Sequence, residues 1–164
     1  MPKKILAINK MYYPEIGGVE TVVKQYSEWL VEAGNEVTVL TSNRSIKFKS
    51  SIELINGVKI IRSSSFAFGF SMPLSFTIFF RFLKIYRKFD VIHIHEPFPI
   101  GTLLSLITPK KIKLIITWHS DIIKQTGSLK NFVTYLQRKS LDKASIVTTT
   151  SYNLLNSSSL LNKH

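Results

Sequence analysis

Glycines, histidines and carboxylates gather at three points where a predicted strand ends. Each point follows a short apolar run that is long enough to form a buried strand. In a parallel sheet, ligands bind at the carboxyl ends of the strands, so residues at these points are candidates for a binding or catalytic site. The candidates are Gly17 and Gly18, His95 and Glu96, and His119 and Asp121.

The glycine pair predicts a phosphate-binding loop or, alternatively, a tight turn that binds nothing. Gly17 and Gly18 stand between the apolar run 5–8 and a helical spacing of apolar residues over 19–33. Free amides and the dipole at a helix N-terminus attract an anion, and glycines allow it to approach the backbone. The spacing matches neither G-x-G-x-x-G nor G-x-x-x-x-G-K-[ST], and Glu20 could complement the dipole instead. Both interpretations stay open on the loop alone.

Histidines differ in what their positions imply. His119 directly follows the run 113–118, so it should lie at the rim of the sheet, exposed to a cleft. There it could donate to a substrate hydroxyl or stabilise charge on a leaving group; alternatively, it is hydrogen-bonded to Asp121 or to backbone. His93 lies inside a strand, which favours a hydrogen-bonded core residue, and the position of His95 at the strand end leaves both roles open.

A metal site is not predicted. The candidate ligands His93, His95, Glu96, His119 and Asp121 would come from two different strands, and no H-x-x-x-H spacing on a helix supports them. The chain also has no cysteine, so thiolate ligands and disulfides are excluded.

Strands and helices are predicted to alternate along the chain. This pattern predicts an α/β fold, a Rossmann-like three-layer sandwich with a mostly parallel sheet and helices on both faces. Asn56-Gly57 is a strong tight-turn signal between two strand-like runs. The predicted strands are 5–8, 36–41, 52–55, 58–61, 90–95, 113–118 and 145–150. The predicted helices are 19–33, 74–88, 100–107, 128–141 and 151–161, the last capped by Ser151, and 43–51 is a predicted loop.

The composition allows one domain with an anionic partner. The 164 residues carry 22 Lys and Arg against 10 Asp and Glu, a net charge of +12, and begin without a signal-peptide pattern. Nucleic acid, an anionic bilayer surface and a phosphorylated small molecule would all fit, but no nucleic-acid-binding motif is present. The aromatic segment 66–88 ends in basic residues and predicts either a core-packing helix or a face that touches lipid. Its uninterrupted apolar part, 73–80, is far shorter than the ~20 residues of a membrane span.

Five segments in register resemble the N-terminal domain of family 4 glycosyltransferases, a retaining group with the GT-B fold. They are Tyr12–Glu20, Leu30–Thr41, Phe89–Phe98, Thr117–Asp121 and Lys143–Ser151. The resemblance covers nearly the whole chain and specifies no particular sugar.

The resemblance implies two Rossmann-like domains with the active site between them. The partners it implies are a nucleotide sugar and a glycan or lipid-linked acceptor, and the reaction transfers a hexose with retention and without a metal or other cofactor. It implies that His119 is catalytic and contacts the transferred sugar. Gly17 and Gly18 would lie against the donor diphosphate or the acceptor. The acceptor side would be lined by His95, Glu96 and Asp121. It also implies a cytoplasmic protein, peripheral at the inner membrane face.

The domain organisation expected from this resemblance is that residues 1–164 form the acceptor-side half of a GT-B enzyme. The family's E-x7-E motif and donor-binding C-terminal domain are absent from the sequence, so the chain alone should be inactive, and a separate chain could supply the other half. The alternative is a non-catalytic Rossmann-like module that recruits an anionic acceptor or a membrane surface. A different nucleotide-binding Rossmann protein is disfavoured, because the run 36–41 is followed by Ser42-Asn43 rather than by an acidic residue.

Overall fold

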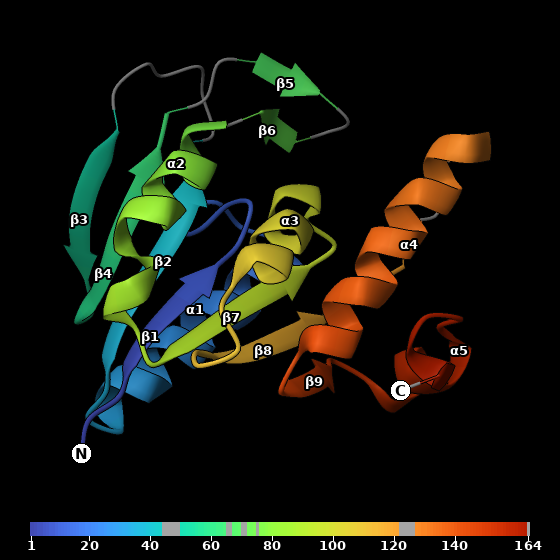
Figure 1. The fold of residues 1–164 in the computed structure, drawn as a ribbon. Coiled ribbons are helices and arrows are strands. Elements are labelled where there is room, and N and C mark those ends of the chain that lie inside the picture. Colours follow the sequence, from blue (N-terminus) through green and yellow to red (C-terminus); the bar gives the residue numbers. More distant parts are fainter. Residues whose placement is uncertain (44–49, 65–66, 70–71, 75, 122–126, 164) are drawn as a thin grey trace. The chain divides into compact units, whose positions relative to one another are not determined.

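The computed structural model describes residues 1–43, 50–64, 67–69, 72–74, 76–121 and 127–163 (Figure 1). The chain divides into two compact units, Met1–Ile92 and His93–His164, and the division falls inside strand β7. No helix among the described residues is both long enough and apolar enough to cross a bilayer.

Four strands of the first unit form a mostly parallel layer. Their order is β3-β4-β2-β1; β1 pairs with β2 and β2 with β4 in parallel, whereas β3 runs antiparallel to β4. Asn56 and Gly57 have positive φ values of 49° and 77° in the turn between β3 and β4, which confirms the predicted tight turn. The bounds are β1 Lys4–Ile8, β2 Glu36–Ser42, β3 Ser51–Ile55 and β4 Val58–Ser63.

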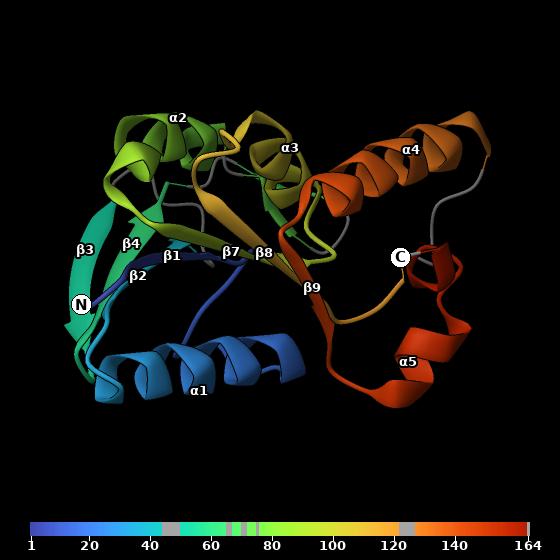
Figure 2. The ribbon, with the colours of Figure 1, turned by 60° about the horizontal axis from the view of Figure 1, so that its bottom comes forward.

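Two helices, α1 (Gly18–Glu32) and α2 (Phe76–Ile85), cover opposite faces of this layer (Figure 2). A short 3-10 helix, Tyr86–Lys88, follows α2. The face under α1 is closed by a buried cluster in which Val23 of α1 and Tyr12 meet strand residues. The buried strand members are Ile5, Ala7, Val37, Val39, Val58 and Ile60.

The second unit repeats the alternation of strands and helices. Strands β7 (Val91–Glu96), β8 (Lys113–Trp118) and β9 (Ile146–Thr149) are neighbours in that order, and β8 and β9 are parallel. Helices α3 (Pro99–Ile107) and α4 (Gly127–Lys143) pack against each other on one side of these strands (Figure 2). Helix α5 (Tyr152–Ser157) and a 3-10 helix, Leu161–Lys163, complete the unit.

Most predicted elements are confirmed, including the cap of α5, where Ser151 Oγ accepts from the Leu154 amide. The predicted bounds of two helices are wrong. Helix α2 begins at Phe76 rather than at 74, because 72–74 is a strand, β6 (Met72–Leu74), paired antiparallel with β5 (Ala67–Gly69). It also ends at Ile85 rather than at 88, because residues 86–88 form the 3-10 helix. Helix α5 ends at Ser157 rather than at 161. Most of the predicted loop 43–51 lies outside the described residues, and its last residue opens β3.

Candidate functional site

Three histidines of the second unit lie in contact at the end of β7 and just after β8. The His93 and His95 ring centroids are 4.2 Å apart, and His95 stacks on His119 at 5.3 Å. His95 Nδ1 and His119 Nε2 are hydrogen-bonded at 3.0 Å, and the His119 backbone amide donates to the Glu96 carbonyl at 2.9 Å. The rings come together because neighbouring strands bring residues at the same level of the sheet side by side.

Burial keeps this group of histidines neutral. It lowers the pKa of His93 and of His119 to about 4, and the pKa of His95 well below its usual value. His95 is only 1% exposed, whereas His119 is half-buried and can meet a ligand. A neutral imidazole has one donor and one acceptor nitrogen, so the hydrogen bond between His95 and His119 couples the tautomers of the two rings: one ring donates and the other accepts.

The structure decides between the interpretations of two histidines. His93 Nε2 is hydrogen-bonded to Thr117 Oγ1 at 2.7 Å, which confirms that His93 is a satisfied residue inside the unit. For His119, the observed hydrogen bond of the ring is to His95, and Asp121 Oδ1 accepts from Trp118 Nε1 at 2.8 Å and from Ser158 Oγ at 2.7 Å. Asp121 therefore joins the end of β8 to the segment after α5.

Glu96 holds the start of α3. Its carboxylate accepts from the Phe98 amide at 2.5 Å and from Thr102 Oγ1 at 2.7 Å, and the residue is 1% exposed. Burial raises the pKa of Glu96 to about 7, although both hydrogen bonds act in the opposite direction. The predicted site residues His95, Glu96, His119 and Asp121 thus lie within one unit. His119 contacts His95 and the Glu96 backbone, whereas Asp121 contacts Trp118 and Ser158.

Gly17 and Gly18 belong to the first unit, where Gly17 is the N-cap of α1. A Cβ on Gly17 would overlap Glu20 Oε2, because the buried Glu20 side chain folds back over the N-terminus of its own helix. A Cβ on Gly18 would meet nothing within 4 Å. The prediction that Glu20 complements the helix dipole is consistent with this geometry, and the open space at Gly18 leaves room for a ligand.

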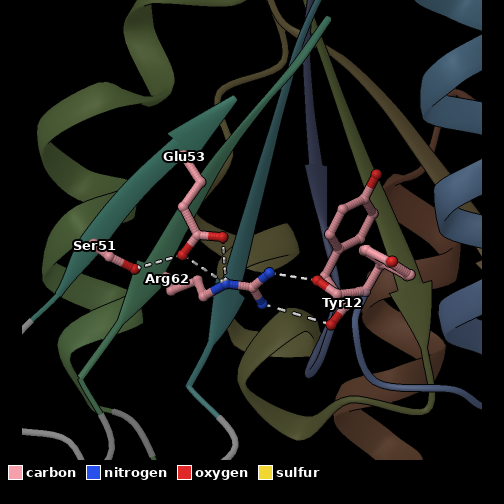
Figure 3. A network of polar contacts seen from close by, with 5 residues as sticks. Tyr12, Ser51, Glu53 and Arg62 are labelled. Carbon is pink, nitrogen blue, oxygen red and sulfur yellow. Dashed lines mark hydrogen bonds and ion pairs between the residues drawn. The ribbon is translucent and has the colours of Figure 1, made fainter. Parts of the chain in front are cut away.

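Arg62 organises a second polar network in the first unit, which the sequence interpretation missed. Its Nε donates to Glu53 Oε1 at 3.0 Å, and its terminal nitrogens donate to the carbonyls of Tyr12 and Tyr13 (Figure 3). Ser51 Oγ donates to the same Glu53 oxygen at 2.8 Å. The network therefore ties β3 and β4 to the segment that leads into the glycine pair. The sequence contained a signal for this network: the two-residue alternation of a strand places Arg62 on the same face as the apolar position 60, so its charge needs a partner there.

Among the described residues, no group of three or more histidine, aspartate or glutamate side chains is arranged to bind a metal ion. The nearest histidine nitrogens on β7 and after β8 hydrogen-bond to each other.

These features define a Rossmann-like α/β chain with polar groups at the carboxyl ends of its strands. Its arrangement matches sucrose-phosphate synthase from Thermosynechococcus elongatus with a TM-score of 0.65 at 18% identity, over 88% of this chain and 41% of that one. This confirms the predicted fold. Residues 16–157 match the model of Glycosyltransferase Family 4, and the chain belongs to that family.

Its relatives in the family include three named enzymes. The O-antigen chain mannosyltransferase C of Escherichia coli is 30% identical over 98% of this chain and 43% of that protein. The D-rhamnosyltransferase WbpZ of Pseudomonas aeruginosa is 27% identical over 82% of this chain and 35% of that protein. The alpha-monoglucosyldiacylglycerol synthase of Acholeplasma laidlawii is 30% identical over 80% of this chain and 33% of that protein. The chain thus spans less than half the length of these relatives.

Proposed function

We propose that residues 1–164 are the acceptor-side part of a glycosyltransferase that moves a hexose from a nucleotide sugar to a glycan or lipid-linked acceptor. The family match and the names of the relatives, which transfer mannose, rhamnose or glucose, support this class of reaction. In the reaction, the bond between the anomeric carbon and the diphosphate breaks, and a bond from that carbon to an acceptor oxygen forms with retention. The acceptor hydroxyl loses its proton, and the nucleoside diphosphate leaves.

The observation that carries the proposal is the neutral, half-buried His119 braced by the buried His95. A neutral imidazole at the end of β8 can donate a hydrogen bond to a hydroxyl of the transferred sugar without the cost of burying a charge. Preorganised hydrogen-bond donors near a reacting centre stabilise the charge that develops there. His119 is therefore our candidate catalytic residue.

The other candidate residues would act in different ways. The exposed Gly18 and the free amides at the start of α1 would meet the donor diphosphate or the acceptor. On the acceptor side, Asp121 would act indirectly by holding the segment after α5, and Glu96 by holding the start of α3. His95 would act through His119, because its own side chain is buried.

The donor-binding part of the enzyme would come from sequence outside these 164 residues. The matched relatives are more than twice as long as the part this chain covers, which supports a second domain on the same or a separate chain. We propose that the 164-residue chain alone does not turn over a nucleotide sugar, that transfer needs no metal, and that the enzyme works in the cytoplasm.

A chimera tests the proposal. This chain would replace the matching 43% of the Escherichia coli mannosyltransferase, and transfer from labelled nucleotide sugars to a membrane extract would be followed by mass spectrometry. We expect product from the chimera, none from the chain alone, and a loss of about 100-fold in kcat on His119→Asn, the scale seen when one transition-state donor is removed.

Ser120→Ala is the matched control, because Ser120 is the exposed neighbour of His119 and should leave the rate unchanged. Full activity of the His119→Asn chimera would overturn the role of His119. Turnover by the isolated chain would overturn the proposed need for a second domain. If a folded chimera gave no product, the non-catalytic binding module would become the better description.

A further inference from the structure

Glu20 is a buried carboxylate that lacks a partner. It lies in the first turn of α1, is 6% exposed, and its Oε1 atom is buried without a hydrogen-bond partner among the described residues. No described cation forms an ion pair with it, since Lys24, one turn further along α1, pairs with Glu28 instead. A buried acceptor without a donor costs free energy, and in native proteins such an atom calls for a water or a ligand that completes it.

The Glu20 carboxylate lies over the start of its own helix. Its Oε2 atom stands where a Cβ on Gly17, the N-cap of α1, would be. Glu20 shares one face of α1 with Val23 and Ser27, the other buried residues of this helix, and Val23 packs against the strands. The free amides at the start of a helix carry partial positive charge. The carboxylate therefore stands where an anionic ligand would otherwise bind.

A second buried oxygen without a partner lies at the same edge of the first unit. Thr41 Oγ1 is buried and makes no hydrogen bond to a described residue. Thr41 follows Val39 by two positions on β2, so its side chain lies on the side of α1. Strands β1 and β2 are parallel and the chain passes from β1 into α1, so the end of β2 and the start of α1 share this edge. Arg62, which pairs with Thr41 across the strands, is already bound to Glu53 and to two carbonyls.

We infer that Glu20 is a specificity-determining residue, which binds a neutral hydroxyl group of the acceptor sugar at the start of α1 and excludes the donor diphosphate from that position. The inference rests on the proposed function and narrows the role of the glycine pair to the acceptor. A hydroxyl that enters the open space at Gly18 can donate to the carboxylate, and hydrogen bonds to a charged acceptor are among the stronger ones. A diphosphate at this position would meet a second negative charge and would have to displace it.

Two substitutions separate the charge of Glu20 from its hydrogen bond. Glu20→Gln keeps the size of the side chain and one acceptor oxygen but removes the charge, whereas Glu20→Ala removes both. The buried Oε1 atom has no hydrogen bond to lose, so both variants should keep the circular dichroism spectrum of the parent chain. Glu32→Gln and Glu32→Ala are the matched controls, because Glu32 is the exposed carboxyl at the other end of the same helix.

The first titration tests the exclusion of an anion. The probe is inorganic pyrophosphate, added to the 164-residue chain at fixed salt, and NMR follows the backbone amides of residues 17–21. We expect these amides to bind pyrophosphate at least tenfold more tightly in Glu20→Gln than in the parent chain or in Glu32→Gln, because one repelling charge is gone. Equal binding at these amides by the parent chain and Glu20→Gln would overturn the exclusion.

The second titration tests the hydroxyl contact. The probes are the methyl glycosides of mannose, rhamnose and glucose, each added to about 0.1 M so that millimolar affinities are measured. We expect at least one of them to shift the amides of residues 17–21 in the parent chain and in Glu32→Ala, and to bind at least tenfold more weakly to Glu20→Ala. No shift with any glycoside, or equal binding by the parent chain and Glu20→Ala, would overturn the inference and assign a buried water as the partner of Glu20. Neither titration involves sugar transfer, so their failure and the failure of the chimera are separate results.

Discussion

At the residue scale, the hydrogen bond between His95 and His119 should set the state of His119. His95 is buried and hydrogen-bonded to the half-buried His119, so the tautomer of His119 is coupled to that of His95. We predict one dominant neutral tautomer of His119 in ring-nitrogen NMR spectra at pH 7, and a mixture of tautomers in His95→Phe. Thr117→Val is the control, because it removes only the partner of His93. An unchanged His119 signal in His95→Phe would show that His95 does not position it.

The two glycines should respond differently to the same substitution. Gly17→Ala forces the Glu20 carboxylate away from the start of α1, so the free energy of unfolding should fall by about 1 kcal/mol. Gly18→Ala adds a methyl group to open space in a helix, so the free energy of unfolding should stay the same or rise by up to ~1 kcal/mol. Urea titrations measure both values.

Activity in the chimera separates a ligand role of Gly18 from a structural one. If Gly18 leaves room for a substrate, Gly18→Ala should raise KM for that substrate at least several-fold without loss of stability. Unchanged kinetics in a stable Gly18→Ala chimera would assign the glycine to backbone geometry alone.

At the scale of elements, Arg62 joins three segments that are distant in sequence. Its partners are Glu53 on β3 and the carbonyls of Tyr12 and Tyr13 (Figure 3). Arg62→Met should lower the free energy of unfolding by about 2 kcal/mol, since it removes the ion pair with Glu53 and the donor to the carbonyls of Tyr12 and Tyr13. Ser51→Ala, which removes one neutral hydrogen bond to Glu53, should cost about 1 kcal/mol. Equal effects of the two changes in urea unfolding would contradict the central role of Arg62.

The elements that the sequence predicted well are those with local signals. Apolar runs, the Asn56-Gly57 turn and the Ser151 cap are each encoded within a few residues, and all three are observed. Strands β5 and β6 have only three residues each and contain Gly69 and Pro73, so no local pattern identifies them.

Contacts between strands limited the prediction of the site. The hydrogen bond of His95 to His119 spans 24 positions, and that of Ser158 to Asp121 spans 37. Residue types marked these positions as candidates, but only the strand order shows which side chains meet. This is why the sequence identified His119 and Asp121 as neighbours of a strand end but left the partner of His119 open.

At the scale of the whole molecule, acid should act on stability in two opposing ways. Burial lowers the pKa values of His93, His95 and His119, so the unfolded chain binds more protons between about pH 4 and 6.5, and stability falls as the pH falls through that range. Burial raises the pKa of Glu96 to about 7, so the folded chain binds more protons between about pH 4.5 and 7, and stability rises as the pH falls there.

Glu96→Gln should therefore make the protein more sensitive to acid. The amide keeps the size of the side chain and one acceptor for the Phe98 amide or Thr102, but it removes the proton uptake that offsets the histidines. Relative to the parent chain, the variant should lose up to about 3 kcal/mol more stability between pH 7.5 and 4.5. Thermal unfolding at each pH measures this difference, and Glu32→Gln, which changes an exposed carboxyl on α1, is the control and should follow the parent chain. If the Tm of Glu96→Gln ran parallel to that of the parent over this range, Glu96 would be ionised in both states, and its carboxylate would hold α3 as an anion at neutral pH.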